Sequence, residues 1–298
     1  MSKIMLNRPV SKKGAYTLNP ISKGDKIPII SDTMFLAMIN NEKKKKYSAY
    51  LISQLLELNY EEVYNTITFQ KEKLDKDNYY DKGKTVDFIC KINGEIIGIE
   101  MNNNNKVRTQ LERNIGYATD LYQSNLSVGE IYHYNKVIQI NINNFTFEGN
   151  DKVIEKYAFT NEKGEYLTDK IQLIHIYLPN IRKKEYNKLK DWEKLLLVFN
   201  ENKIESLKIA KGDKIMEEYV KDAVDTSDEE EIIGLYDKEL HLEKLRLSEL
   251  EEERVEAREQ GEKSKQIEIA RNMINKGMDK EIIKELTGLS TEELNNIS

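Results

Sequence analysis

Hydrophobic and polar residues repeat in two ways along the first 180 residues, by alternation and with helical spacing, and these patterns predict strands and helices. Alternating apolar and polar side chains, typical of half-buried strands, predict strands at 63–70, 86–101 and 136–142. Helical spacing predicts helices at 47–58 and 105–123. Both element types share one part of the chain, which indicates a mixed fold rather than an all-helical or all-strand one.

The predicted helix at 105–123 gathers its apolar residues on one face, which is expected to pack against a sheet. These residues are Val107, Leu111, Ile115, Ala118 and Tyr122. Ser31 or Asp32 can cap an earlier helix, and a further strand pair turns at Gly164. The order helix, three strands, helix, strand and added hairpin predicts an α+β fold for 31–180.

The remaining segments are predicted to flank this core. Residues 1–30 form an extended lead-in, and 181–262 form a helical extension that includes one long, acidic, solvated helix. Residues 263–298 form a small module of three short helices, because Gly277 and Gly288 suit C-caps and Ser290 with Glu293 suits a capping box. Two interpretations of the module stay open. Its mixed charge favours a packing or homo-oligomerisation module over a helix-turn-helix DNA reader.

Composition and charge limit the expected cellular location and the possible partners of the protein. No apolar run approaches the ~20 residues of a membrane helix, and the start of the chain lacks a signal-peptide core. The single cysteine, Cys90, excludes internal disulfides and cysteine-based zinc sites. We therefore expect a cytoplasmic protein without a membrane partner. Residues 228–262 hold 14 acids and 5 bases, a net of −9, so the total of −6 leaves +3 elsewhere, which is compatible with nucleic acid.

The stretch VDFICKINGEIIGIEMNNNN, residues 86–105, predicts a β-hairpin with a defined register. Asn93-Gly94 suits a two-residue type I′ turn, and this turn pairs Phe88 with Ile99 and places Asp87 opposite Glu100. One face is then wholly apolar: Val86, Phe88, Cys90, Ile92, Ile97, Ile99 and Met101. The other is mixed: Asp87, Ile89, Lys91, Ile96, Gly98, Glu100 and Asn102.

Two carboxylates directly opposite each other repel and destabilise a sheet, so their presence requires a reason. One interpretation is a hard divalent cation such as Mg²⁺, which prefers carboxylate, carbonyl and water oxygens. A second is a pair in which one acid is protonated, and a third is a solvated strand edge whose acids pair with Lys84 or Lys106. The pairing alone does not decide among these interpretations.

The order of short motifs along the chain resembles a nuclease family. Asp87 and Glu100, with Asn102 two residues further, resemble the PD-(D/E)xK signature. Ser31-Asp32 with Phe35 precedes this pattern, Arg113 with Tyr117 follows it, and GLSTEE closes the chain at 288–293. In this order the motifs resemble the Rpn-type recombination-promoting nucleases, which are also classed as PD-(D/E)xK transposases. The resemblance extends over nearly the whole chain.

The resemblance implies a restriction-endonuclease-like αβββαβ core, a mixed sheet flanked by helices, with a helical C-terminal region. It implies a metal-dependent DNA endonuclease that promotes recombination or acts on mobile or invading DNA. Asp87 and Glu100 would be the catalytic metal ligands for Mg²⁺, with Mn²⁺ as a substitute. Asn102 would be catalytic in the position where the general signature has lysine and this branch often has glutamine.

Several further residues are candidates for the same site. Lys84 or Lys106 would supply the charge that Asn102 lacks, and Asp32 or Glu57 would add a ligand, although both acids also suit caps or solvated helix positions. Arg113 and Tyr117 lie one helical turn apart and would contact a DNA phosphate, or else form an ordinary helix face against the sheet. The alternative function is a weak or inactive relative that binds DNA or a protein partner without cutting.

Overall fold

The computed structural model describes residues 25–70, 86–103, 107–124, 134–200, 212 and 214–297. Its centre is a six-stranded sheet with the order β1-β2-β3-β4-β6-β5, in which β3, β4 and β6 are parallel and the outer neighbours are antiparallel. The strands are β1 (Thr68–Phe69), β2 (Phe88–Ile92), β3 (Glu95–Asn102), β4 (Val137–Asn143), β5 (Ile154–Thr160) and β6 (Tyr166–Tyr177).

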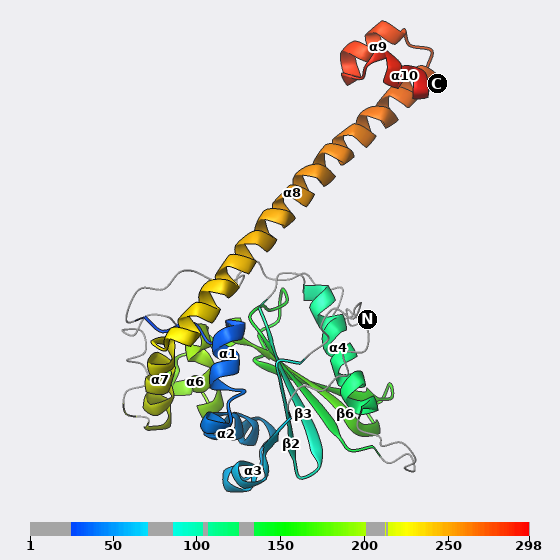
Figure 1. Cartoon of the computed structure of the whole chain (residues 1–298). Coiled ribbons are helices and arrows are strands. Elements are labelled where there is room, and N and C mark those ends of the chain that lie inside the picture. Colours follow the sequence, from blue (N-terminus) through cyan, green and yellow to red (C-terminus); the bar gives the residue numbers. More distant parts are fainter. Residues whose placement is uncertain are drawn as a thin grey trace. The chain divides into compact units, whose positions relative to one another are not determined.

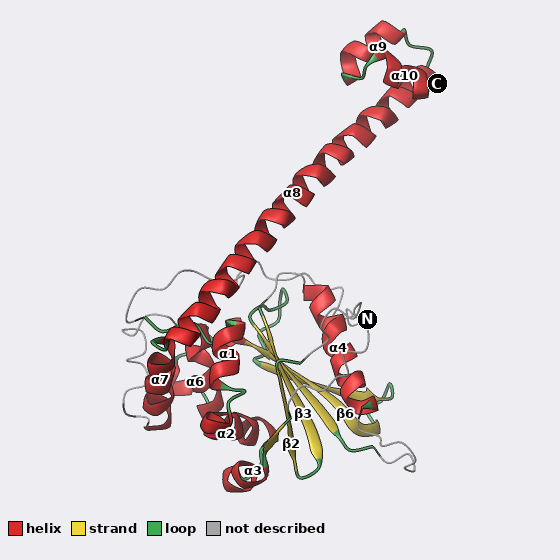
Figure 2. Ribbon diagram, in the orientation of Figure 1, coloured by secondary structure: helices red, strands yellow, loops and turns green. Residues whose placement is uncertain are grey.

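Helices cover both faces of this sheet, as Figure 1 and Figure 2 show, with α4 on one side and α1, α2, α6 and α7 on the other. These and the shorter helices are α1 (Asp32–Met38), η2 (Glu42–Lys44), α2 (Lys45–Leu56), α3 (Tyr60–Thr66), α4 (Val107–Gln123), α5 (Leu178–Ile181), η3 (Tyr186–Lys188), α6 (Asp191–Leu197), η4 (Val198–Asn200) and α7 (Lys214–Ser227). The predicted α+β architecture is therefore confirmed.

The described end of the predicted lead-in lies in the core. Ile27, Ile29 and Ile30 are fully buried, and the ammonium of Lys26 donates a hydrogen bond to the carbonyl of Val198 at 3.1 Å. A lysine buried in this way keeps a partner for its charge. Residues 1–24 of the predicted lead-in lie outside the described residues.

The predicted strand at 63–70 is wrong for most of its length. Residues 60–66 form the helix α3, and only Thr68 and Phe69 join the sheet as β1. Asn59 caps this helix by accepting a hydrogen bond from the N–H of Glu62 at 3.0 Å. The β-branched residues suggest a strand, but a strong N-cap outweighs that weak preference.

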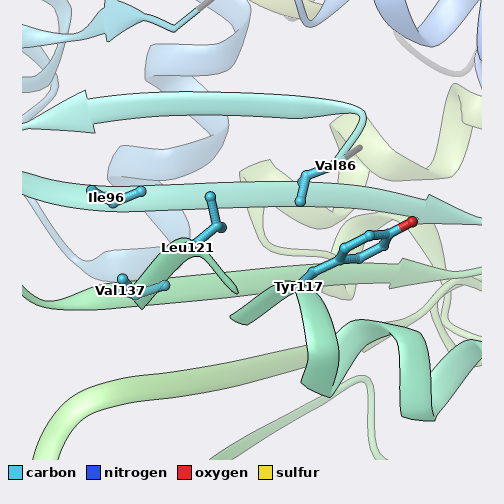
Figure 3. Close-up of a cluster of buried hydrophobic side chains, with 5 residues drawn as sticks. All are labelled: Val86, Ile96, Tyr117, Leu121 and Val137. Carbon is cyan, nitrogen blue, oxygen red and sulfur yellow. The ribbon is translucent and has the colours of Figure 1, made fainter. Parts of the chain in front are cut away.

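The predicted apolar face of α4 is partly wrong as well. Ile115 is 49% exposed, whereas Tyr117 and Leu121 are buried against the sheet. Figure 3 shows these two α4 side chains beside Val86, so Val86 packs on the α4 side and not on the predicted face with Phe88. Strand β2 begins only at Phe88, and the alternation of faces therefore does not extend back to Val86.

A second compact unit, Leu240–Ser298, begins within the long helix α8 (Glu230–Asn275). It also contains α9 (Lys280–Thr287) and α10 (Thr291–Ile297). The predicted long helix is confirmed, and the first of the three short helices predicted for 263–298 is instead the end of α8. None of the described helices combines the length and apolar character that a membrane span requires.

Candidate active site

A tight turn brings the two predicted acids together at the open end of the β2–β3 hairpin. Asn93 and Gly94 have φ values of 51° and 85°, as a type I′ turn requires. The five cross-strand pairs of residues 88–92 follow the predicted register, which is thereby confirmed. One step beyond the last pair, Asp87 lies beside Glu100.

Hydrogen bonds hold both carboxylates in place. The N–H of Asp87 donates to Oε2 of Glu100 at 3.1 Å, and the N–H of Met101 donates to Oδ2 of Asp87 at 2.8 Å. The side-chain amide of Asn40 donates to the carbonyl of Asp87 at 3.2 Å and anchors the chain just before β2. Backbone N–H groups therefore hold one oxygen of each carboxylate in place.

Burial makes this carboxylate pair electrostatically unfavourable without a cation. Burial raises the pKa of Glu100 to about 9, and the nearby charge of Asp87 raises it too, while a backbone hydrogen bond from Asp87 and the charge of Arg113 oppose the rise. Glu100 is only 3% exposed beneath α4. The predicted solvated strand edge is therefore wrong for Glu100, and either a bound proton or a compensating cation relieves the pair.

The donor set fits a hard divalent cation. Carboxylate oxygens are the ligands that Mg²⁺ prefers, and Mg²⁺ usually combines one or two of them with water and substrate phosphate. Within the described ranges, no group of three or more His, Cys, Asp or Glu side chains is arranged so that it could hold a metal ion. Asp87 and Glu100 would therefore be the protein carboxylates at the ion, with water and phosphate oxygens completing its coordination.

The other predicted site residues fall in different places. Asp32, the first residue of α1, is close enough for its charge to contribute to the raised pKa of Glu100. Glu57 is an exposed residue that ends α2 in a left-handed conformation, which suits the alternative role of a cap. Lys84 and Lys106 lie outside the described residues.

Arg113 and Tyr117 both meet the carboxylate pair from α4. Nη2 of Arg113 lies 3.6 Å from Oε1 of Glu100 and donates a hydrogen bond to the hydroxyl of Tyr117. Desolvation lowers the pKa of Arg113, but Tyr117 and the carboxylates outweigh it, so the guanidinium stays charged. The Arg113 side chain is 45% exposed, which leaves it accessible to a DNA phosphate.

Asn102, for which a catalytic role was predicted, has its side chain in the protein interior. It is fully buried, its amide nitrogen donates to Oδ1 of Asn143 at 2.9 Å, and its amide oxygen accepts a hydrogen bond from Gln110. Both polar atoms of the side chain thus have partners inside the protein.

A row of four polar side chains, three buried and one half-buried, was not anticipated from the sequence. Glu100 pairs with Asn141, Asn141 with His175, and His175 with Glu155, so a polar residue lies at this level on each of four neighbouring strands. Burial lowers the pKa of His175 to about 4, which leaves the ring neutral at pH 7. The signal for this row is the alternation of Gln and Asn with isoleucine in 137–143.

The C-terminal unit has its own small core, formed by Ala270, Ile283, Leu289 and Leu294. Ser290 and Glu293 form the predicted capping box, because each side chain accepts a hydrogen bond from the other residue's N–H, at 3.2 and 2.7 Å. Residues 263–298 contain six basic and six acidic residues, and α10 carries only acidic charges. Net charge therefore supplies little attraction for DNA to this unit.

Comparison with known families accounts for both parts of the chain. A family model described as PD-(D/E)XK nuclease family transposase matches residues 29–253. A second model, described as the C-terminal HTH domain of the Rpn/YhgA-like nuclease family, matches residues 263–298 and supports the interpretation of this module that the sequence had favoured less. Curated proteins and solved structures gave no significant match.

Proposed function

The chain belongs to the PD-(D/E)XK nuclease transposase family, and from this premise we propose that it is a metal-dependent DNA endonuclease. The observation that carries the proposal is the pair of half-buried Asp87 and buried Glu100, which hydrogen bonds hold together beside the charged Arg113. A cation that joins two carboxylates to a phosphate suits phosphodiester hydrolysis better than chemistry on an uncharged substrate.

In this proposal the two carboxylates act together by binding one metal ion. Asp87 and Glu100 would hold Mg²⁺, or Mn²⁺ in its place, next to the scissile phosphate. When bound, the ion would lower the pKa of the attacking water and stabilise charge on the phosphate and leaving oxygen. The water oxygen bonds to phosphorus, the bridging phosphorus–oxygen bond breaks, and one proton of the water ends on the leaving oxygen.

Plasmid cleavage in the presence of Mg²⁺ or Mn²⁺ tests the site. We expect Asp87→Asn and Glu100→Gln to lower the cleavage rate by about 10²-fold or more, because each removes a charge that holds the ion. Glu112→Gln is the matched control, since this acid is an exposed residue of the same α4 that covers the site. Equal cleavage by parent and site variants would refute the assignment.

The cellular substrate is proposed to be DNA undergoing recombination, or mobile or invading DNA, in line with the transposase description of the matched family. Recombination frequency between marked DNA segments, measured in cells that produce the parent or Asp87→Asn, tests this role. The parent is expected to raise the frequency and the variant to leave it at background. An equal rise with both proteins would separate the recombination role from cleavage.

A second candidate function is DNA binding without cleavage, which the match of residues 263–298 to an HTH domain favours. It predicts that the protein binds duplex DNA with an affinity that falls as salt increases, while plasmid remains intact with either cation. Loss of binding on removal of 263–298 would locate the interaction in that unit. Metal-dependent nicking by the parent would contradict this candidate.

A further inference from the structure

Asn102 stands where the PD-(D/E)xK signature has its lysine, but its side chain is committed elsewhere. The residue is fully buried, and its amide nitrogen and amide oxygen bind Asn143 and Gln110. A buried amide whose donor and acceptor are both satisfied loses those bonds if it turns outward. Asn102 therefore has no inexpensive way to reach a water or a phosphate at the carboxylate pair.

The hydrogen bonds of Asn102 are part of a series of hydrogen bonds that runs from α4 to the sheet, with each donor pointing toward the sheet. Nη1 of Arg113 donates to Gln110 at 3.3 Å, and Nε2 of Gln110 donates to Asn102. Asn102 donates to Asn143 at 2.9 Å, whose own amide donates to the carbonyl of Ile176 at 3.1 Å. Each amide accepts from one neighbour and donates to the next, so successive bonds polarise one another.

The outer end of this series of hydrogen bonds is the charged guanidinium of Arg113, which lies next to Glu100. The guanidinium of Arg113 is about half exposed, lies 3.6 Å from Glu100, and is also held by the hydroxyl of Tyr117. Two anchors, Gln110 and Tyr117, restrict a long side chain that would otherwise lose considerable rotamer freedom on binding DNA. A guanidinium also presents several donors in a plane that matches two oxygens of a phosphate.

We propose that Arg113 supplies the positive charge at the cleavage site, and that Asn102 and Gln110 are positioning residues that act through it. This inference rests on the proposed nuclease function. Arg113 would bind a non-bridging phosphate oxygen and offset the negative charge that develops during hydrolysis. It transfers no proton, because an arginine side chain does not deprotonate in proteins. The missing signature lysine is thus replaced from the facing helix.

Cleavage assays with variants of Arg113 test the catalytic part of the proposal. Arg113→Ala is expected to lower the rate by about 10²–10³-fold, and added guanidinium ion is expected to restore part of it, because a small cation can occupy the vacated place. Arg113→Lys should retain more activity than Arg113→Ala. Arg108→Ala, at an exposed position on the same helix, is the matched control and should cut like the parent.

The outcomes separate this inference from the proposed function. If the parent fails to cut, or Asp87→Asn cuts equally well, the nuclease proposal fails and the inference fails with it. If the parent cuts, Asp87→Asn does not, and Arg113→Ala cuts like the parent, only the inference is overturned. An Arg113→Ala protein that guanidinium does not rescue would also overturn it, provided its thermal unfolding matches that of the parent.

A double-mutant cycle tests the positioning role of Gln110. Gln110→Leu removes both hydrogen bonds at similar volume and should lower the cleavage rate. In an Arg113→Ala background the same change should have no further effect, since Gln110 acts through the missing guanidinium. Gln110→Glu, which can still accept from Arg113, is the second variant if Gln110→Leu fails to fold. Equal losses in both backgrounds would contradict the positioning role.

Discussion

Replacing Glu100 with glutamine should make the metal-free protein more stable, even though the same change should slow cleavage strongly. Glu100 is 3% exposed, and burial together with the adjacent Asp87 raises its pKa to about 9. Glutamine is neutral, has nearly the same shape, and still offers an oxygen to the N–H of Asp87. The substitution therefore removes an electrostatic cost and keeps the packing.

The size of this effect follows from the two pKa values. The unfolded chain ionises this carboxyl near its ordinary value of 4.5, whereas the folded protein holds the proton until about 9. Because the folded-state pKa is the higher one, stability falls as pH rises from 4.5 toward 9. At pH 7 the accumulated cost is about 3 kcal/mol, at about 1.4 kcal/mol for each pH unit.

Urea denaturation in the presence of EDTA measures the difference directly. At pH 7 we expect Glu100→Gln to be more stable than the parent by about 3 kcal/mol, and near pH 4.5 we expect the difference to vanish. Mg²⁺ or Mn²⁺ should stabilise the parent at pH 7 and leave the variant unchanged. If the variant is no more stable than the parent at pH 7, the buried Glu100 does not carry the electrostatic cost described above.

Three further changes probe other parts of the structure. Gly98→Ala should lower the unfolding free energy by about 1–3 kcal/mol in urea, because the added methyl group would clash with Oε1 of Gln139 and lie 2.9 Å from Cδ1 of Leu121. Protonation of His175 should cost stability as pH falls from 6.5 toward 4, since burial lowers the pKa of this ring to about 4, and His175→Asn should lack that contribution. Ser290→Ala removes the cap of α10 and should cost about 1 kcal/mol, seen as faster amide exchange in residues 291–297.

The hairpin and its acid pair were predictable because their determinants are local. Asn93-Gly94 allows few turn geometries, and a two-residue turn determines every cross-strand pair up to Asp87 and Glu100. The capping box at Ser290 is local in the same way, since it joins residues three positions apart. Where a few neighbouring residues determine the geometry, the sequence alone was sufficient.

The covering of the site by α4 could not be predicted in this way. Helical spacing alone permits a rotation that places Ile115 inward, but the structure turns Gln110 and Asn114 toward the sheet. That rotation lets Gln110 donate a hydrogen bond to Asn102 of β3, which itself donates to Asn143 of β4. Partners from distant segments therefore decided which α4 residues are buried, and a single-segment pattern contains no record of them.

The contacts of the site join residues that lie at different distances along the chain, and this affects the order in which the contacts form during folding. Asp87 and Glu100 meet across 13 residues, so the hairpin can bring two negative charges together early, whereas Asn102 meets Asn143 only across 41 residues. The repulsion would then be present before α4 and β4 cover it. Protons or divalent ions that relieve this repulsion should speed refolding, so the catalytic ion would also assist the formation of the protein that uses it.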